Sequence, residues 1–232
     1  MKRHLGTSLG ILLAFFLFVE PVCAEMVLIY GIDETGSYSF REKALALGGK
    51  IISEMKPGDV FYARRITHSS YSDDCNILRL ALPEVGDPPQ NKFDRRARYQ
   101  WEMRMKTVEG LKAQACNSLV RLPPVRAKMT DIWGFFAAAS DRFRTECRGD
   151  CHKVIVIASD MKDNCNREIA MDLKGVRVMV VGFESGGDPK LARKIVQGWT
   201  NSLKKYGVSD VEFLPPDCPL TINSQLKEVQ AR

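Results

Sequence analysis

Residues 26–37 decide the fold, and they read Met-Val-Leu-Ile-Tyr-Gly-Ile-Asp-Glu-Thr-Gly-Ser. The first seven are continuously apolar and too few for an ordinary helix, which predicts a β-strand that is buried on both faces. Asp33, Thr35 and Ser37 follow at once and bring carboxylate and hydroxyl oxygens to the end of that strand. The stretch therefore predicts a buried parallel strand with metal-ligating oxygens at its carboxyl end.

The rest of the chain alternates between strand-like and helix-like segments. Short apolar runs predict further strands at 60–66, 77–82, 154–158, 176–183 and 211–214. Apolar residues at spacings of three and four predict helices at 40–55, 92–119, 132–143 and 189–206. This alternation predicts an α/β fold with a mostly parallel central sheet and helices on both faces. No linker stands out, so we expect one domain over residues 25–232.

Composition and the first residues bear on location. The 232 residues are 45% hydrophobic and 27% charged, with a formal net charge of +6, which excludes a disordered, collagen-like or polytopic membrane protein. Lys2 and Arg3 precede an apolar run at 9–19, and Val22-Cys23-Ala24 forms a small-residue cleavage signal. This layout predicts a secretory signal peptide at 1–24 with cleavage before Glu25. We expect a periplasmic or secreted protein with no stable membrane span after cleavage; an uncleaved anchor is the alternative.

Cleavage would remove Cys23 and leave six cysteines, an even number that favours disulfides in an exported chain. Cys147 and Cys151 would join a helix end to a strand start. Cys165 and Cys218 follow strands and are expected to pair, which leaves Cys75 with Cys116. A free or intermolecular thiol is the alternative.

Oxygen-bearing side chains recur at other predicted loop positions. Thr130 and Asp131 precede a helix, and Ser159 and Asp160 end the 154–158 strand, with Asp163 close behind. Carboxylates and hydroxyls without histidine or thiolate suit a hard cation such as Mg²⁺ or Mn²⁺. The alternative is that Ser37 and Thr130 are simply helix N-cap residues.

The segment Asp33-Glu34-Thr35-Gly36-Ser37 resembles the Asp-x-Ser/Thr-x-Ser motif of von Willebrand factor A (VWA) domains. In that family the motif opens a metal-ion-dependent adhesion site (MIDAS). Thr130 is similar to the family's threonine on a second loop, and Asp160 to its aspartate after the fourth strand. The resemblance covers residues 26–214 and implies a three-layer, Rossmann-like VWA fold. It also implies a metal site made of Asp33, Thr35, Ser37, Thr130 and Asp160.

Two positions depart from the family pattern. Thr35 replaces the commoner serine, which keeps the hydroxyl and adds a methyl group. Met161 stands where the family often has glycine, so the sequence does not define the conformation of that turn.

The resemblance implies protein binding, in which a partner's acidic side chain completes the metal's coordination. The expected role is adhesion or envelope assembly, and the chain is not expected to be an enzyme. A structural subunit without a working metal site and a metal-dependent phosphohydrolase or nuclease are the alternatives.

Charge also favours an acidic partner. Residues 92–128 hold ten lysines and arginines against three acidic residues, a balance that can steer an acidic protein. The simpler interpretation is that these charges form the solvated face of a helix. Export of the protein argues against a nucleic-acid partner.

Overall fold

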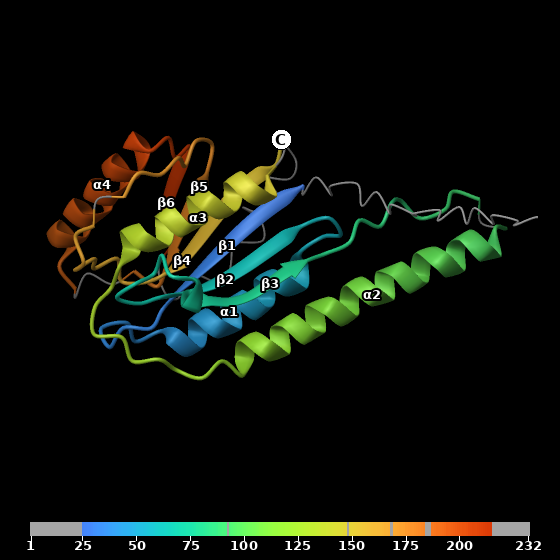
Figure 1. Ribbon diagram of the computed structural model, residues 1–232, viewed down its shortest axis with the longest axis horizontal. Helices are drawn as coiled ribbons and strands as arrows, with labels where there is room; N and C mark the ends of the chain where they lie inside the picture. The colour runs from blue at the N-terminus through green and yellow to red at the C-terminus, as the bar shows by residue number, and fades with distance from the viewer. Residues whose placement is uncertain (1–24, 92, 148, 168, 184–186, 215–232) are drawn as a thin grey trace, which may run out of the picture.

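The computed structural model describes residues 25–91, 93–147, 149–167, 169–183 and 187–214 (Figure 1). The predicted signal peptide, its cleavage site and Cys218 lie outside these residues. A six-stranded sheet has the order β3-β2-β1-β4-β5-β6. Its strands are β1 (Met26–Asp33), β2 (Val60–Ile66), β3 (Asn76–Ala81), β4 (His152–Ala158), β5 (Arg177–Val181) and β6 (Asp210–Leu214). The helices are α1 (Arg41–Glu54), η1 (Asp73–Cys75, a 3-10 turn), α2 (Arg95–Val120), α3 (Ile132–Glu146) and α4 (Pro189–Lys205).

The sheet is mostly parallel, as the sequence predicts. The pairs β2–β1, β1–β4, β4–β5 and β5–β6 are parallel, and β3 pairs with β2 antiparallel. This is the strand order of doubly wound dinucleotide-binding sheets, with one edge strand reversed. Among the described residues, no helix is long and apolar enough to cross a membrane.

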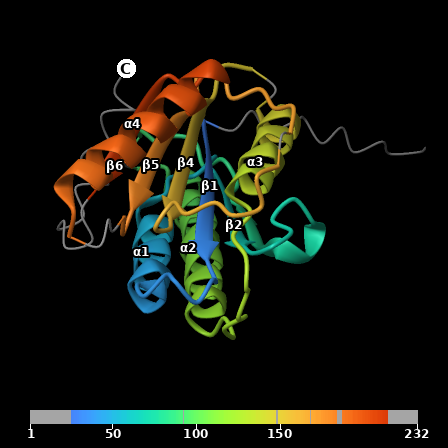
Figure 2. The same cartoon turned by 90° about the vertical axis from the view of Figure 1, so that its left-hand side faces the viewer.

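Helices cover both faces of the sheet, because successive residues of a buried strand point to opposite sides. Leu28, Tyr30 and Ile32 of β1 pack in the core under α1 and α2. Val27 and Ile29 pack in the second core, with residues of α3 and α4. Figure 2 shows the two helix layers on either side of the strands. The predicted three-layer α/β fold is confirmed.

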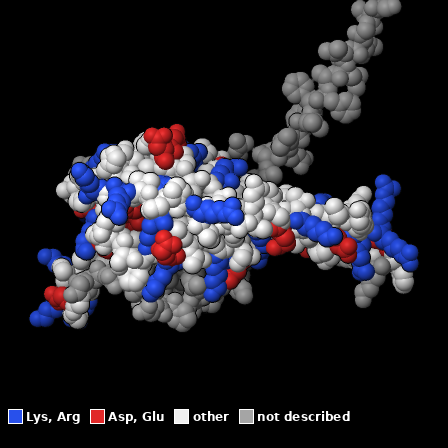
Figure 3. Space-filling view, turned by 90° about the horizontal axis from the view of Figure 1, so that it is seen from below, with Lys and Arg blue, Asp and Glu red and all other residues white. Residues whose placement is uncertain are grey.

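Helix α2 lies against α1 along only part of its length. Its buried residues lie in the second half of the helix, from Val108 to Leu119. The first half projects beyond the sheet (Figure 1), where Figure 3 shows lysines and arginines on its exposed end. The helix begins at Arg95 rather than at residue 92, because the Asp94 carboxylate caps it by accepting a hydrogen bond from Ala97 N at 2.9 Å.

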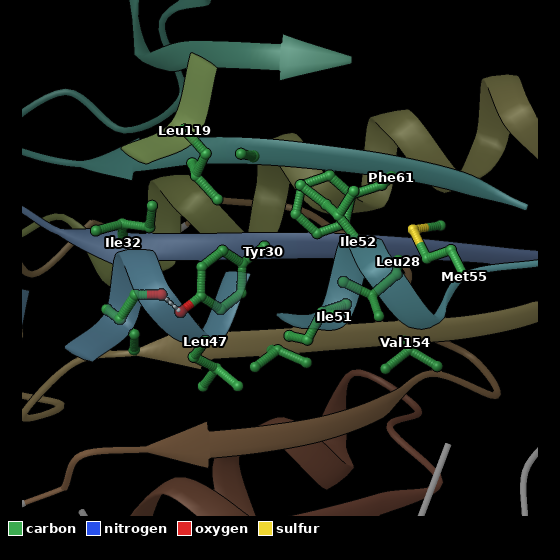
Figure 4. Close-up of a cluster of buried hydrophobic side chains, with 14 of the residues drawn as sticks. Leu28, Tyr30, Ile32, Leu47, Ile51, Ile52, Met55, Phe61, Leu119 and Val154 are labelled. Carbon is green, nitrogen blue, oxygen red and sulfur yellow. Dashed lines mark hydrogen bonds between the residues drawn. The ribbon is translucent and has the colours of Figure 1, made fainter. Parts of the chain in front are cut away.

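The contact between α1 and α2 depends on a glycine. A Cβ added to Gly48 would lie 2.6 Å from Leu119 Cδ2 and 2.9 Å from Tyr30 Cε1. Both neighbours are fully buried, and the Tyr30 hydroxyl donates a 2.6 Å hydrogen bond to Ala44 O (Figure 4). The next residue, Gly49, would place its Cβ in open space.

These adjacent glycines provide a matched pair of substitutions. Gly48→Ala should lower the free energy of unfolding, because overpacking a filled core costs ~1–3 kcal/mol and outweighs the gain in helix propensity. Gly49→Ala should raise it by up to ~1 kcal/mol, since it gains propensity without a clash. Urea unfolding of both variants measures the difference. A Gly48→Ala variant as stable as the Gly49→Ala variant would contradict this close packing of α1 against α2.

The turn before β2 buries an acid. Asp59 is fully buried, and its Oδ2 accepts a hydrogen bond from Lys56 N at 2.8 Å, while Oδ1 has no hydrogen-bond partner among the residues that the structure describes. Burial raises the pKa of Asp59 to about 6, and the charge of Glu25 adds to the effect. The Lys56 N–H opposes it.

This raised pKa predicts a pH-dependent stability. Well below pH ~4 the carboxyl is protonated in both the folded and the unfolded chain, so it imposes no penalty. As the pH rises to about 6, the unfolded chain loses its proton first, and the free energy of unfolding should fall by roughly 2–3 kcal/mol. Asp59→Asn should flatten this part of the curve, measured by urea unfolding with EDTA between pH 4 and 7. Parallel curves for wild type and variant would show that Asp59 ionises normally.

Candidate metal centre

Four of the five predicted ligands lie at the topological switch point of the sheet: Asp33, Thr35, Ser37 and Asp160. β1 and β4 are adjacent and parallel, with β2 on the far side of β1 and β5 on the far side of β4. Ligands of open α/β sheets bind beyond the carboxyl ends of the strands at such a point. Figure 2 shows the arrowheads of β1, β4 and β5 at one edge of the sheet. Asp33 ends β1 there, and Ser159 and Asp160 follow β4.

The loop after β1 gathers three of the predicted ligands. Asp33 Oδ1 accepts hydrogen bonds from Thr35 N at 2.9 Å and Thr35 Oγ1 at 2.6 Å. Thr35 Oγ1 lies 3.2 Å from Ser37 Oγ. Ser37 does not cap α1, whose N-cap is Phe40. The motif spacing thus places one carboxylate and two hydroxyls together.

Glu34, inside the same motif, has a different role. Its buried carboxylate accepts hydrogen bonds from Arg41 Nε at 2.7 Å, Arg65 Nη1 at 3.2 Å and Val125 N at 3.3 Å. Its backbone oxygen accepts from Ala127 N at 3.1 Å. Glu34 therefore fastens the segment between α2 and α3 to the end of β1, and its carboxylate is fully engaged in doing so.

The loop after β4 closes the site from the other side. Ser159 Oγ donates a 2.6 Å hydrogen bond to Asp33 Oδ2 and accepts one from Met161 N at 3.0 Å. Asp160 accepts from Lys162 N at 3.2 Å and Lys162 Nζ at 3.0 Å. The VWA motif assigns no role to Ser159, although its hydroxyl contacts Asp33. Its position directly after a buried strand was the signal that could have identified it.

The Met161 turn has the conformation that glycine usually supplies. Met161 has a φ of 59°, in the left-handed region. This conformation costs a non-glycine residue ~1–2 kcal/mol. The side chain is buried, and the Met161 carbonyl accepts a 2.9 Å hydrogen bond from Trp199 Nε1. Burial and these hydrogen bonds offset the backbone strain.

Thr130 lies on a loop that is tied to the loop after β4. Thr130 N donates to Asn164 Oδ1 at 2.7 Å, and Asn164 N donates to Thr130 O at 3.1 Å. Asp163 Oδ1 accepts from Ile132 N at 2.7 Å. The N-cap of α3 is Asp131, which accepts from Gly134 N at 2.9 Å. The alternative in which Ser37 and Thr130 serve as N-caps is therefore wrong.

The electrostatics of the site suit a cation. Burial raises the pKa of Asp33, and the negative charge of Asp160 adds to this, while hydrogen bonds from Ser159 and Thr35 lower it. The cation that contacts Asp160 is Lys162, whose side chain is 60% exposed. A divalent ion would offset the repulsion between the two carboxylates, and oxygen donors alone fit Mg²⁺ or Mn²⁺.

The cysteines agree only in part with the predicted pairing. Cys147 and Cys151 form a disulfide with Cα atoms 5.7 Å apart, just before β4 and at the opposite edge of the sheet from the site. The predicted Cys75–Cys116 bridge is absent, and both thiols are free. Cys116 Sγ contacts Gly49 O of α1 at 3.3 Å, whereas Cys75 Sγ contacts Ser69 O in the loop after β2 at 3.3 Å. The two cysteines therefore pack on different elements.

Cys165 lies beside that same loop. Its Sγ is 3.7 Å from His68 O. Its predicted partner, Cys218, is outside the described residues, so the Cys165–Cys218 bridge stays a prediction.

The strand order and the two helix layers define a three-layer α/β domain, which is the architecture that the resemblance of the motif implies. No protein-family model matches the chain, and no curated protein matches it in sequence.

Among solved structures, the chain is similar to proximal thread matrix protein 1 from the mussel byssus with a zinc occupied MIDAS motif. The two are 12% identical with a TM-score of 0.47, over 90% of this chain and 46% of that chain. A second crystal form of the mussel protein gives 11% identity and a TM-score of 0.45 over the same shares. The chain thus spans about half the length of the mussel protein.

Ser159 can be tested by its effect on stability. Ser159→Ala should lower the free energy of unfolding by ~1–3 kcal/mol, because Asp33 Oδ2 and Met161 N would each lose a buried hydrogen bond. Ser118→Ala is the matched control, since within the described part of the chain its exposed hydroxyl bonds only to Gln114 O of its own helix. Its effect should stay within ~0.5 kcal/mol. Urea unfolding in EDTA measures both, and equal effects would contradict the described role of Ser159.

Proposed function

We propose that this chain is an exported domain that binds a protein partner through a divalent metal ion. Asp33, Thr35, Ser37, Thr130 and Asp160 would hold Mg²⁺ or Mn²⁺. The observation that carries the proposal is the meeting of the Asp33-Thr35-Ser37 cluster with the Ser159-Asp160 loop at the switch point.

The charge of the site supports binding of a partner carboxylate. Three of the five proposed ligands are neutral hydroxyls, so Asp33 and Asp160 together would only balance the charge of a divalent ion. Mg²⁺ takes about six oxygen ligands, so five protein oxygens would leave one coordination position open to a further carboxylate. A glutamate or aspartate from a partner is the simplest such group, and the surrounding loops would select the partner.

The small number of carboxylates among the proposed ligands favours binding over catalysis. The proposed site has two carboxylates, those of Asp33 and Asp160. A two-metal hydrolase places several carboxylates around ions ~3.5–4 Å apart. His152 opens β4 and so lies at the opposite edge of the sheet. We therefore propose adhesion or envelope assembly as the role, rather than hydrolysis.

The export component of the proposal rests on residues 2–24. Their basic start, short apolar run and small-residue end support secretion to the periplasm or beyond.

One observation favours a structural subunit without a working metal site. Lys162 Nζ lies 3.0 Å from Asp160 Oδ2, and both oxygens of Asp33 already accept hydrogen bonds from Thr35 and Ser159. Lys162 could then serve as the permanent counter-ion. Metal titration separates the two functions.

Isothermal titration with Mg²⁺, Mn²⁺ and Zn²⁺ tests the proposal. We expect Mg²⁺ or Mn²⁺ to bind at one site, and Asp33→Ala and Asp160→Ala each to weaken binding at least ~10-fold, because each removes a charged ligand. Asp87→Ala is the control, since this exposed carboxylate lies in the loop between β3 and α2. Its affinity should equal that of the wild type.

Two results would contradict the proposal. Absence of binding in the folded wild-type protein would favour the structural subunit. Equal weakening by Asp87→Ala would show that general surface charge, rather than a defined site, attracts the ion.

A further inference from the structure

A cavity of about 740 Å³ adjoins the proposed metal centre. Three segments line it: the end of β2 with Arg65, Thr67 and His68; the η1 turn; and residues 125–129 between α2 and α3. Its volume lies in the ~300–1,000 Å³ range of ligand pockets.

Backbone contacts place this cavity directly beside the site. Ile66, between Arg65 and Thr67, is the register partner of Asp33. Ala127 forms a β-bridge with Thr35, and the cavity wall continues to Met129, next to the proposed ligand Thr130. A peptide whose carboxylate reached the metal centre could therefore extend into the cavity.

The charges along the cavity favour an anionic occupant. Arg126 and Lys128 are exposed on its wall, and among the described residues neither forms an ion pair. Arg65, also in the wall, is held by Glu34 at 3.2 Å. Asp74 is the acidic residue of the lining. Two unpaired cations against one carboxylate leave the wall net positive.

The apolar part of the lining favours a peptide over a nucleic acid. Val125, Ala127 and Met129 supply small and flexible aliphatic surface, and Val125 and Met129 are 42% and 43% exposed. No Phe, Tyr or Trp from the described residues lines the cavity, so it lacks the stacking platforms that bind single-stranded bases.

We propose that this cavity is a second contact site for the protein partner, and that it takes an acidic segment with at least one aliphatic side chain. Arg126 and Lys128 would pair with the segment's carboxylates, and Val125 and Met129 would cover the aliphatic side chain. The inference rests on the proposed function, because it assigns to the partner a second contact beyond the metal-bound carboxylate.

Fluorescence polarisation with a labelled peptide of alternating glutamate and leucine tests the cavity. The wild-type protein with Mg²⁺ should bind the peptide, and more weakly at high salt. The double variant Arg126→Ala/Lys128→Ala should bind it ~5- to 20-fold more weakly, as expected from the loss of two partly exposed charge pairs. It should bind Mg²⁺ as the wild type does. The control, Lys190→Ala/Lys194→Ala, removes the same charge from exposed residues of α4 and should match the wild type.

A second variant tests the cavity without removing a cation. Val125→Glu adds a carboxylate at the wall, and it should weaken peptide binding while leaving Mg²⁺ binding unchanged. Val125 contacts Glu34 through its backbone N–H, so this hydrogen bond is preserved.

The outcomes distinguish the cavity from the metal centre. Peptide binding that is unchanged in both cavity variants, or equally weakened in the α4 control, would overturn the proposed role of the cavity. The metal titration would then still test the proposed function by itself. Cavity-dependent peptide binding in a protein that binds no metal supports the cavity and overturns the proposed function. Tighter binding of a single-stranded oligonucleotide of equal charge overturns the assignment to an acidic peptide.

Discussion

The buried carboxylate of Asp33 is the interaction on which the site depends. It ends β1, and its two oxygens accept hydrogen bonds from different loops, Thr35 on one side and Ser159 on the other. An ionised carboxylate can remain in such a place only if hydrogen bonds or a cation compensate for the lost water. The compensation draws the loops after β1 and β4 together at the switch point of the sheet.

Glu34 provides the complementary constraint. It is adjacent to Asp33 in the chain, yet its carboxylate contacts Arg41, Arg65 and a backbone N–H of the segment after α2. One turn therefore directs two acids to separate tasks: the first faces the site, and the second anchors the segment that forms the wall of the cavity. The contacts of Glu34 with Val125 and Ala127 explain why the end of the long segment between β2 and α3 lies at a fixed position beside the site.

How far the sequence predicts the structure depends on how local the signal is. A buried parallel strand is a continuous apolar run, which is a local signal. The strand predicted at 154–158 therefore agrees closely with the observed strand β4. The pairing of cysteines is not local, since Cys75 and Cys116 are brought to different elements by the path of the chain. The projection of α2 likewise could not be predicted, because an apolar stripe does not reveal where the sheet beneath it ends.

The sequence by itself determined the strand and helix order and the presence of Asp33, Thr35 and Ser37 within one turn, because both follow from spacing along the chain. Only the tertiary structure decided that Ser159 completes the hydrogen bonding of Asp33, that Asp131 rather than Thr130 caps α3, and that a cavity adjoins the site. These features join residues far apart in sequence, and such contacts are set by how strands and loops pack rather than by any local pattern.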